Sequence, residues 1–172
     1  MKYLIAGLLC ISLSGVLHAQ TALKKPVKPA AAISAAPIPD SVTISAAAIA
    51  KYLAAHNASQ LDMLRSLYAW MSSHITYDMV NTYNPEYYKD TADAVDKTLK
   101  TRTAVCQGYA SLFMETARQA GIPAWLVSGY TLKDGKPDAD SHAWVAVFIN
   151  NKWLLADPTW GAGYANNNKY QP

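Results

Sequence analysis

The chain has 172 residues, 51% of them hydrophobic, and carries 15 Lys and Arg against 12 Asp and Glu, a formal net charge of +3. Residues 1–40 hold four of these bases and one of the acids, so the remaining 132 residues carry 11 charges of each sign. This balance argues against a basic surface for nucleic acid, and no long basic amphipathic helix suggests attachment to a membrane surface.

The first residues, MKYLIAGLLCISLSGVLHAQ, have the layout of a secretory signal peptide. Lys2 supplies the charged start, residues 4–17 form an apolar run too short to span a bilayer comfortably, and Ala19 precedes a plausible cleavage point. We therefore expect residues 1–19 to be a signal peptide and the mature protein to be exported, either periplasmic or extracellular, and not membrane-spanning.

Residues 20–40 are rich in Ala, Pro and Lys and show neither a helical nor a strand period. This composition predicts a flexible or partly extended linker. Residues 41–172 are numerous enough to form one domain with a core of its own.

The first part of this domain reads as helical. Residues 45–55 predict a short helix, and Ser59 begins a second one, with Asp62 at capping-box spacing. Residues 75–90 are loop-like, and residues 91–101 predict another short helix. Residues 105–120 predict a helix that is apolar around much of its circumference and therefore buried, ending at Gly121.

Three strands are predicted next, over residues 124–132, 141–149 and 152–160. Residues 133–140 have the composition of a polar turn region, and Asn150-Asn151 is a tight-turn signal. Helices followed by a run of antiparallel strands predict an α+β fold.

A two-residue loop at Asn150-Asn151 fixes which residues of the last two strands face each other. Trp144 then faces Asp157, and His142, two residues before Trp144, lies diagonally opposite Asp157 on the same face of the sheet. A register shift of one residue would put His142 and Asp157 on opposite faces, so the prediction depends on this turn.

The cysteine count is informative. Of the two cysteines, Cys10 lies in the leader, so one thiol, Cys106, remains after cleavage. An odd cysteine in an oxidising compartment indicates intermolecular pairing or a reactive thiol, and the alternative is a small buried apolar side chain. Because Cys106 falls at the start of a predicted helix, the positive helix end favours its thiolate.

Cys106, His142 and Asp157 together would supply the groups for acyl transfer. The imidazole can pair with the thiolate and protonate a leaving amine, while the aspartate orients the ring, and a backbone N–H at the helix start could serve as an oxyanion donor. Each residue also has an ordinary structural explanation: His142 could be a satisfied core histidine, and Asp157 before Pro158 could start a turn.

The segments RTAVCQGYASLFMETARQAGIPAWLVSGY, SHAWVAVFINNKWLLADPTWGAG and WMSSHITYD resemble the transglutaminase-like superfamily, in particular its kyphoscoliosis-peptidase-like branch. The resemblance covers roughly residues 60–164. It implies a papain-like fold, a cysteine-bearing helix packed on an antiparallel sheet, with Cys106 as the nucleophile, His142 as the base and Asp157 as the orienting acid. Members of this family include transglutaminases, peptidases, peptide N-glycanases and proteins that have lost activity.

Four further residues are candidates for the walls of a substrate cleft: Gln107, Tyr109, Trp144 and Trp160. The alternative for the aromatic ones is core packing, and Gln107 could instead cap locally. One cysteine and scattered histidines give no metal-ligand spacing, and we expect neither a metal nor a cofactor. Relatives in this branch usually continue beyond the 15 residues that follow Asp157, so the chain could be a minimal member or a fragment.

The resulting hypothesis is an exported cysteine-dependent enzyme that acts on amide bonds of a protein or peptide through a thioester. Whether water or an amine accepts the acyl group depends on loops such as 79–91 and 133–140. The alternative is a non-catalytic transglutaminase-like module that binds a protein or wall peptide in the cell envelope. The sequence leaves the oligomeric state open.

Overall fold

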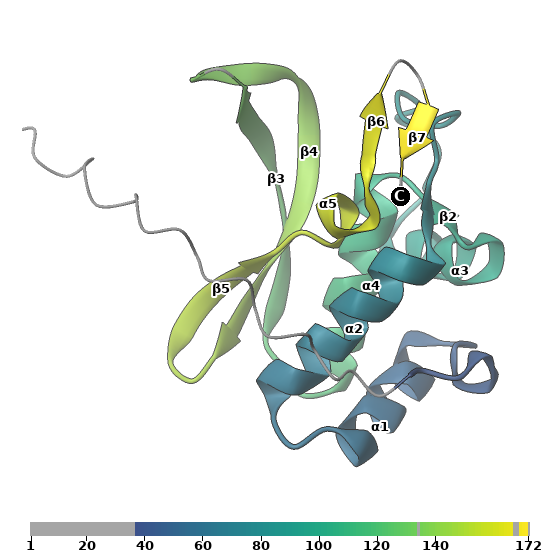
Figure 1. Ribbon diagram of the computed structural model, residues 1–172, viewed down its shortest axis with the longest axis vertical. Helices are drawn as coiled ribbons and strands as arrows, with labels where there is room; N and C mark the ends of the chain where they lie inside the picture. Colours follow the sequence, from purple (N-terminus) through teal and green to yellow (C-terminus); the bar gives the residue numbers. More distant parts are fainter. Residues whose placement is uncertain (1–36, 134, 167–168, 172) are drawn as a thin grey trace, which may run out of the picture. The chain divides into compact units, whose positions relative to one another are not determined.

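The computed structural model of the chain describes residues 37–133, 135–166 and 169–171 (Figure 1). A short 3-10 helix, η1, precedes the α-helices. The helices have the following bounds: η1 Asp40–Val42, α1 Ala46–His56, α2 Gln60–His74, α3 Thr91–Thr101, α4 Cys106–Gln119 and α5 Pro158–Ala162.

The strands of the described residues form three separate sheets. Their bounds are β1 Thr76–Tyr77, β2 Thr103–Ala104, β3 Ala124–Lys133, β4 Lys136–Ile149, β5 Lys152–Ala156, β6 Tyr164–Asn166 and β7 Lys169–Gln171. The central sheet is antiparallel with the order β3-β4-β5, β1 pairs with β2 in parallel, and β6 pairs with β7. The predicted α+β class with an antiparallel sheet is confirmed.

Side-chain caps explain why the first helices begin where they do. The Ser45 hydroxyl accepts the N–H of Ala48 at the start of α1, and Ser59 accepts the N–H of Asp62 at the start of α2. Asp90 does the same for α3 by accepting the N–H of Asp93. Each cap satisfies a backbone donor that has no partner inside its helix. The four predicted helices before the sheet are confirmed to within one or two residues.

The turn at Asn150-Asn151 sets the register of β4 and β5. Both asparagines have positive φ values, 51° and 58°, which a tight hairpin turn requires. Ile149 pairs with Lys152, Phe148 with Trp153 and Ala146 with Leu155, which is the register that a two-residue loop at Asn150-Asn151 produces. Asp157 follows the last paired residue of β5, so it lies where the predicted register places it, next to the strand that carries His142.

The two faces of strand β4 differ in burial. Its odd-numbered residues from 143 to 149 are buried, whereas His142, Trp144, Ala146 and Phe148 alternate with them and are half-buried. The buried side packs against α4, in which Tyr109 and Phe113 are almost completely buried. Helix α4 is thus buried as its apolar composition predicts, and its first residue is Cys106.

Two predicted segments are wrong in detail. Residues 133–140 are not a separate polar loop, because β3 and β4 continue into them as far as Lys133 and Lys136 and form a long hairpin. The last predicted strand stops at Ala156, since Pro158 occupies the first turn of α5 and Asp157 caps that helix. Pro158 cannot donate to a strand ladder, but it is well suited to a first helical turn.

The predicted signal peptide and almost all of the predicted linker lie outside the described residues. Across the part of the chain that the structure describes, no helix is both long enough and apolar enough to cross a lipid bilayer.

Candidate active site

Helix α4 presents Cys106 at its first position. The preceding residue, Val105, has an extended backbone and makes no side-chain cap bond, while its carbonyl accepts the N–H groups of Gly108 and Tyr109. The N–H groups of Cys106 and Gln107 therefore point out of the helix start without an acceptor from the helix itself. Cys106 is a free thiol that is partly exposed. A thiol beside backbone donors at a positive helix end is a favourable place for negative charge.

Close packing beneath this first turn requires a glycine at position 108. A Cβ there would lie 2.3 Å from the Tyr88 hydroxyl, 2.7 Å from the Thr98 hydroxyl and 2.8 Å from the Ala104 methyl group. Burial raises the pKa of Tyr88 to about 12, so this hydroxyl is neutral at physiological pH. The start of α4 is thus fixed against α3 and the loop before it by contacts that leave no room for a side chain.

His142 and Asp157 form a short hydrogen bond. The His142 Nε2 atom lies 2.7 Å from Asp157 Oδ2, and the two side chains are 13% and 21% exposed. Because Nε2 is engaged by the carboxylate, Nδ1 is the ring nitrogen that remains for the Cys106 thiol, which also interacts with this imidazole. The structure therefore brings Cys106, His142 and Asp157 together from a helix start, a strand and the residue after the next strand.

Asp157 performs two structural tasks with its two carboxylate oxygens. Oδ2 binds His142, whereas Oδ1 accepts the N–H groups of Thr159 and Trp160 at 3.1 and 3.2 Å and so caps α5. Asp157 therefore both starts the turn into α5 and is bonded to the imidazole of His142. Capping fixes the carboxylate in the rotamer that faces the imidazole.

The surroundings of His142 favour its protonated form. Hydrogen bonding of the ring to Asp157, and secondarily to Cys106, raises the pKa of His142 to about 9, although partial burial opposes this shift. The ring is consequently an imidazolium at neutral pH, which suits it to pair with a thiolate on one nitrogen and a carboxylate on the other.

This shift predicts a pH dependence of stability. Because the pKa of His142 rises from 6.5 to about 9 on folding, the contribution is complete below pH 6.5 and is lost as pH increases through about 9. Both side chains keep some contact with water, so we expect the free energy of unfolding to fall by about 2 kcal/mol over this range. Thermal unfolding at a series of pH values would measure it. The His142→Gln variant should show a flatter profile, and equal profiles would contradict the assignment.

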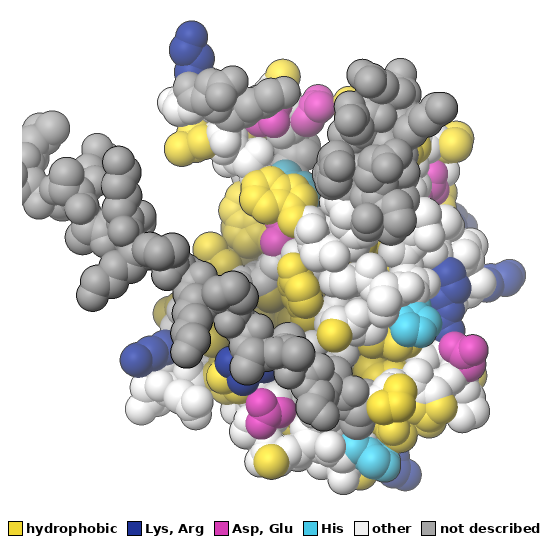
Figure 2. Space-filling model, viewed as in Figure 1, with side chains coloured by type: hydrophobic (Ala, Val, Ile, Leu, Met, Phe, Trp, Pro, Cys, Tyr) yellow, Lys and Arg dark blue, Asp and Glu magenta, His cyan; other side chains and the backbone are white. Residues whose placement is uncertain are grey.

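Two tryptophans enclose the imidazole. The Trp160 ring is stacked on His142 with centroids 5.4 Å apart, and the Trp144 ring lies on it at 6.0 Å. Figure 2 shows large hydrophobic side chains gathered on the side of the molecule where β4 and α5 lie. Trp144 also covers Gly129, where an added Cβ would lie 2.9 Å from its ring. These aromatic faces restrict the ring and favour its positive charge.

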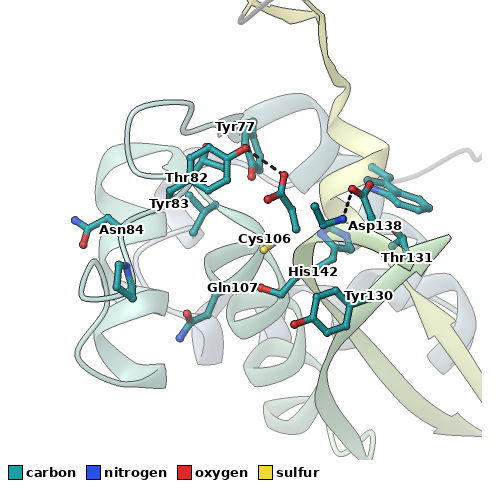
Figure 3. Close-up of a pocket in the computed structure, with 16 residues that line it drawn as sticks. Tyr77, Thr82, Tyr83, Asn84, Cys106, Gln107, Tyr130, Thr131, Asp138 and His142 are labelled. Carbon is teal, nitrogen blue, oxygen red and sulfur yellow. Dashed lines mark hydrogen bonds between the residues drawn. The ribbon is translucent and has the colours of Figure 1, made fainter. Parts of the chain in front are cut away.

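A cleft of about 560 Å³ opens above Cys106 and His142 (Figure 3). Its walls come from the loop after β1, the start of α4, the β3–β4 hairpin and α5. The lining residues are Tyr77, Thr82, Tyr83, Asn84, Pro85, Val105, Cys106, Gln107, Tyr130, Thr131, Asp138, Ala139, Asp140, Ser141, His142 and Trp160.

The four residues expected in the cleft walls divide into two groups. Gln107 and Trp160 line the cleft. Tyr109 does not, because it is completely buried and its hydroxyl donates to the Ile75 carbonyl, so it belongs to the core. Trp144 is also outside the lining and packs on His142 and Gly129 instead.

Sequence reasoning missed several cleft residues, among them Tyr77, Tyr83, Tyr130, Asp138 and Asp140. The segments 79–91 and 133–140 were expected to control access, and both contribute to the lining. No spacing pattern distinguishes the individual residues, since they come from a loop and from a hairpin end that the sequence predicts as a turn.

The cysteine-bearing helix packed on an antiparallel sheet defines a papain-like α+β fold. Residues 47–158 match the family model described as the transglutaminase-like superfamily, and the chain belongs to this superfamily.

Several characterised sequences and structures are similar to parts of the chain. Kyphoscoliosis peptidase of Mus musculus is 34% identical over 113 residues, which cover 61% of this chain. Protein-glutamine gamma-glutamyltransferase of Pseudomonas aeruginosa is 38% identical over 79 residues, 40% of this chain. The crystal structure of the periplasmic domain of TgpA from Pseudomonas aeruginosa bound to ethylmercury superposes with a TM-score of 0.53 and 30% identity over 67% of this chain.

The chain spans only part of each of these proteins. It covers 16% of the kyphoscoliosis peptidase, 12% of the gamma-glutamyltransferase and 44% of the TgpA domain. The shared region is therefore the transglutaminase-like core, and the similarity concerns this core alone.

Proposed function

We propose that the protein is an exported cysteine-dependent enzyme that acts on amide bonds through Cys106, His142 and Asp157. The observation that carries this proposal is the 2.7 Å bond between His142 Nε2 and Asp157 Oδ2, with the other side of the imidazole directed to the thiol at the start of α4. Nucleophile, acid–base group and orienting carboxylate then stand in the order that acyl transfer requires.

In the first half of the reaction, the thiolate of Cys106 attacks the amide carbonyl carbon. The negative charge that develops on the carbonyl oxygen is stabilised by N–H groups at the start of α4. The His142 imidazolium gives its proton to the departing nitrogen, the C–N bond breaks, and ammonia or an amine leaves. The acyl group remains on Cys106 as a thioester, and His142 is now neutral.

In the second half, neutral His142 removes a proton from the acceptor while the acceptor attacks the thioester carbonyl. The C–S bond breaks, Cys106 leaves as a thiolate, and His142 is again an imidazolium. Asp157 keeps the ring oriented and stabilises its charge in both halves. With water as the acceptor the reaction is hydrolysis, and with a primary amine it is transamidation.

The relatives support both acceptors. One is named a peptidase and another a protein-glutamine gamma-glutamyltransferase, and the chain shares only its core with either. We therefore assign the substrate as an amide group of a protein or peptide, with the acceptor to be identified by experiment.

Export is part of the proposal. The leader-like residues 1–19 and the similarity to a periplasmic domain both support it. We expect protein recovered from the producing cell's envelope or medium to begin at Gln20. Intact-mass measurement tests this expectation, and retention of Met1 on the exported protein would contradict it.

The central test is the reactivity of Cys106 as a function of pH. In the proposed ion pair with His142, Cys106 should be alkylated rapidly at about pH 6, where a thiol at the reference pKa of ~8.5 is almost wholly protonated. Iodoacetamide labelling followed by mass spectrometry gives the rate. The His142→Gln variant serves as the matched control and should lose this acid-range reactivity while remaining folded.

Activity is measured with a glutamine-rich protein, with and without a fluorescent primary amine. Release of ammonia without the amine indicates hydrolysis, and incorporation of the label indicates transamidation, while mass spectrometry detects peptide cleavage. All three should be absent in Cys106→Ala. If Cys106 titrates as an ordinary thiol and no amide is consumed, the protein is instead a non-catalytic transglutaminase-like binding module.

A further inference from the structure

The two walls of the cleft are joined by a side-chain hydrogen bond. The Tyr83 hydroxyl, from the loop after β1, donates to Asp140 Oδ2 in β4 at 3.2 Å, although the two residues are 57 positions apart. Both residues line the cleft that contains Cys106 and His142. In Figure 3, a dashed line marks this bond at the labelled Tyr83.

The bond and the thiol belong to one cleft, whose lining also includes Tyr77. Tyr77 in β1 pairs with Ala104 in β2, which precedes Cys106 by two positions. The Tyr77 side chain interacts electrostatically with Cys106, Tyr83 and Asp140. Burial is the main reason that the pKa of Tyr77 is raised, and these three neighbours add to it. The Tyr77 phenol is therefore within electrostatic range of Tyr83, of Asp140 and of the Cys106 thiol.

The bond is also suited to open. Tyr83 is 78% exposed and Asp140 is exposed, so water competes for both partners. Asp140 belongs to the end of the β3–β4 hairpin, where the register of the two strands shifts between Tyr130 and Leu132. Neither partner is anchored in the core, so separating them costs little.

We propose that Tyr83 and Asp140 form a bar across the cleft that determines which groups reach Cys106. Closed, the bar admits slender groups, such as an unbranched side chain or a chain end, and retards bulky ones. This inference rests on the proposed function for its biological meaning, since it names the shape of the acyl group that the thiol would accept.

The test compares two neutral reagents with the same chemistry and different sizes, N-methylmaleimide and N-(1-pyrenyl)maleimide. Their rates with Cys106 are measured at a mildly alkaline pH, where any accessible thiol reacts. Tyr83→Phe removes the donor and Asp140→Ala removes the acceptor of the bond. In both variants the rate with the pyrenyl reagent should increase about three- to tenfold, while the rate with the methyl reagent changes less than about twofold.

Asp138→Ala is the matched control, because it truncates a carboxylate on the same wall of the cleft. Among the bonds that the structure describes, this carboxylate accepts only the N–H of Ala139, the next residue. The ratio of the two rates in Asp138→Ala should equal that of the wild type. The proposal is overturned if neither Tyr83→Phe nor Asp140→Ala changes the ratio of the two rates, or if Asp138→Ala raises this ratio as much as Asp140→Ala. Thermal unfolding of each variant shows whether the fold is retained.

The two proposals fail separately in these measurements. An ordinary thiol titration of Cys106 would reject the catalytic function and leave the size selection by the bar measurable. An unchanged ratio of rates would reject the bar and leave the acid-range reactivity of Cys106 as it is.

Discussion

Asp157→Asn is expected to abolish the acid-range reactivity of Cys106 and to reduce amide turnover by about 10⁴-fold, the loss known for the corresponding change in a serine triad. The reason is chemical and not steric. An amide keeps the shape of the carboxylate and can still cap α5, but it carries no charge to stabilise the imidazolium and can donate to Nε2, which favours the wrong tautomer.

The matched control is Asp90→Asn. Asp90 caps α3 through its carboxylate as Asp157 caps α5, and no histidine is bonded to it in the described structure. The two substitutions are thus the same chemical change at two helix starts. Alkylation rate against pH and thermal unfolding should be recorded for both. Loss of the fold in Asp157→Asn with an unchanged alkylation profile would make Asp157 a purely structural residue.

Gly108→Ala should destabilise the fold and inactivate the site, although alanine is ordinarily the better residue in a helix by about 1 kcal/mol. The added methyl group would lie within 2.3–2.8 Å of Tyr88, Thr98 and Ala104. Because the Ala104 methyl group cannot rotate away, the start of α4 must shift. We expect a net loss of about 1–3 kcal/mol in the free energy of unfolding, measured by denaturant titration. The shift should also displace Cys106 from its position beside His142.

A second substitution tests the cause of this effect. Tyr88→Phe removes the hydroxyl that the new methyl group meets first, so it should partly restore stability to Gly108→Ala. In the double-mutant cycle, the loss of unfolding free energy caused by Gly108→Ala should therefore be smaller in the Tyr88→Phe background than in the wild type. If Gly108→Ala alone is more stable than the wild type, the close approach described for this helix turn is incorrect.

The sequence was sufficient for the features that depend on local patterns. The Asn150-Asn151 turn has a single favourable geometry, so the register of β4 and β5, and with it the approach of His142 and Asp157, could be predicted before the fold was known. The positions at which the helices capped by Ser45, Ser59 and Asp90 begin also depend on local sequence, since the capping side chain satisfies a backbone donor three residues away.

Features that depend on distant segments could not be predicted. Tyr109 lies one helical turn from Cys106, yet its hydroxyl reaches back to Ile75 and makes it a core residue. Trp160 was expected on a strand. Instead, the Asp157 cap and Pro158 in the first turn begin helix α5, and this helix places the Trp160 ring on His142. The bond between Tyr83 and Asp140 joins segments 57 residues apart, and no spacing in the chain indicates it.

The hairpin that joins His142 to Asp157 has a consequence for how the protein folds. These two residues are 15 positions apart and are brought together by one tight turn, whereas Cys106 joins them only when α4 docks against the sheet. Local contacts form early in folding because they close short loops, and non-local ones follow. The imidazole–carboxylate pair would then exist in a species that still has an ordinary thiol. Reactivity of Cys106 in acid would report the last tertiary step of folding, and it would be the first property lost as the protein begins to unfold.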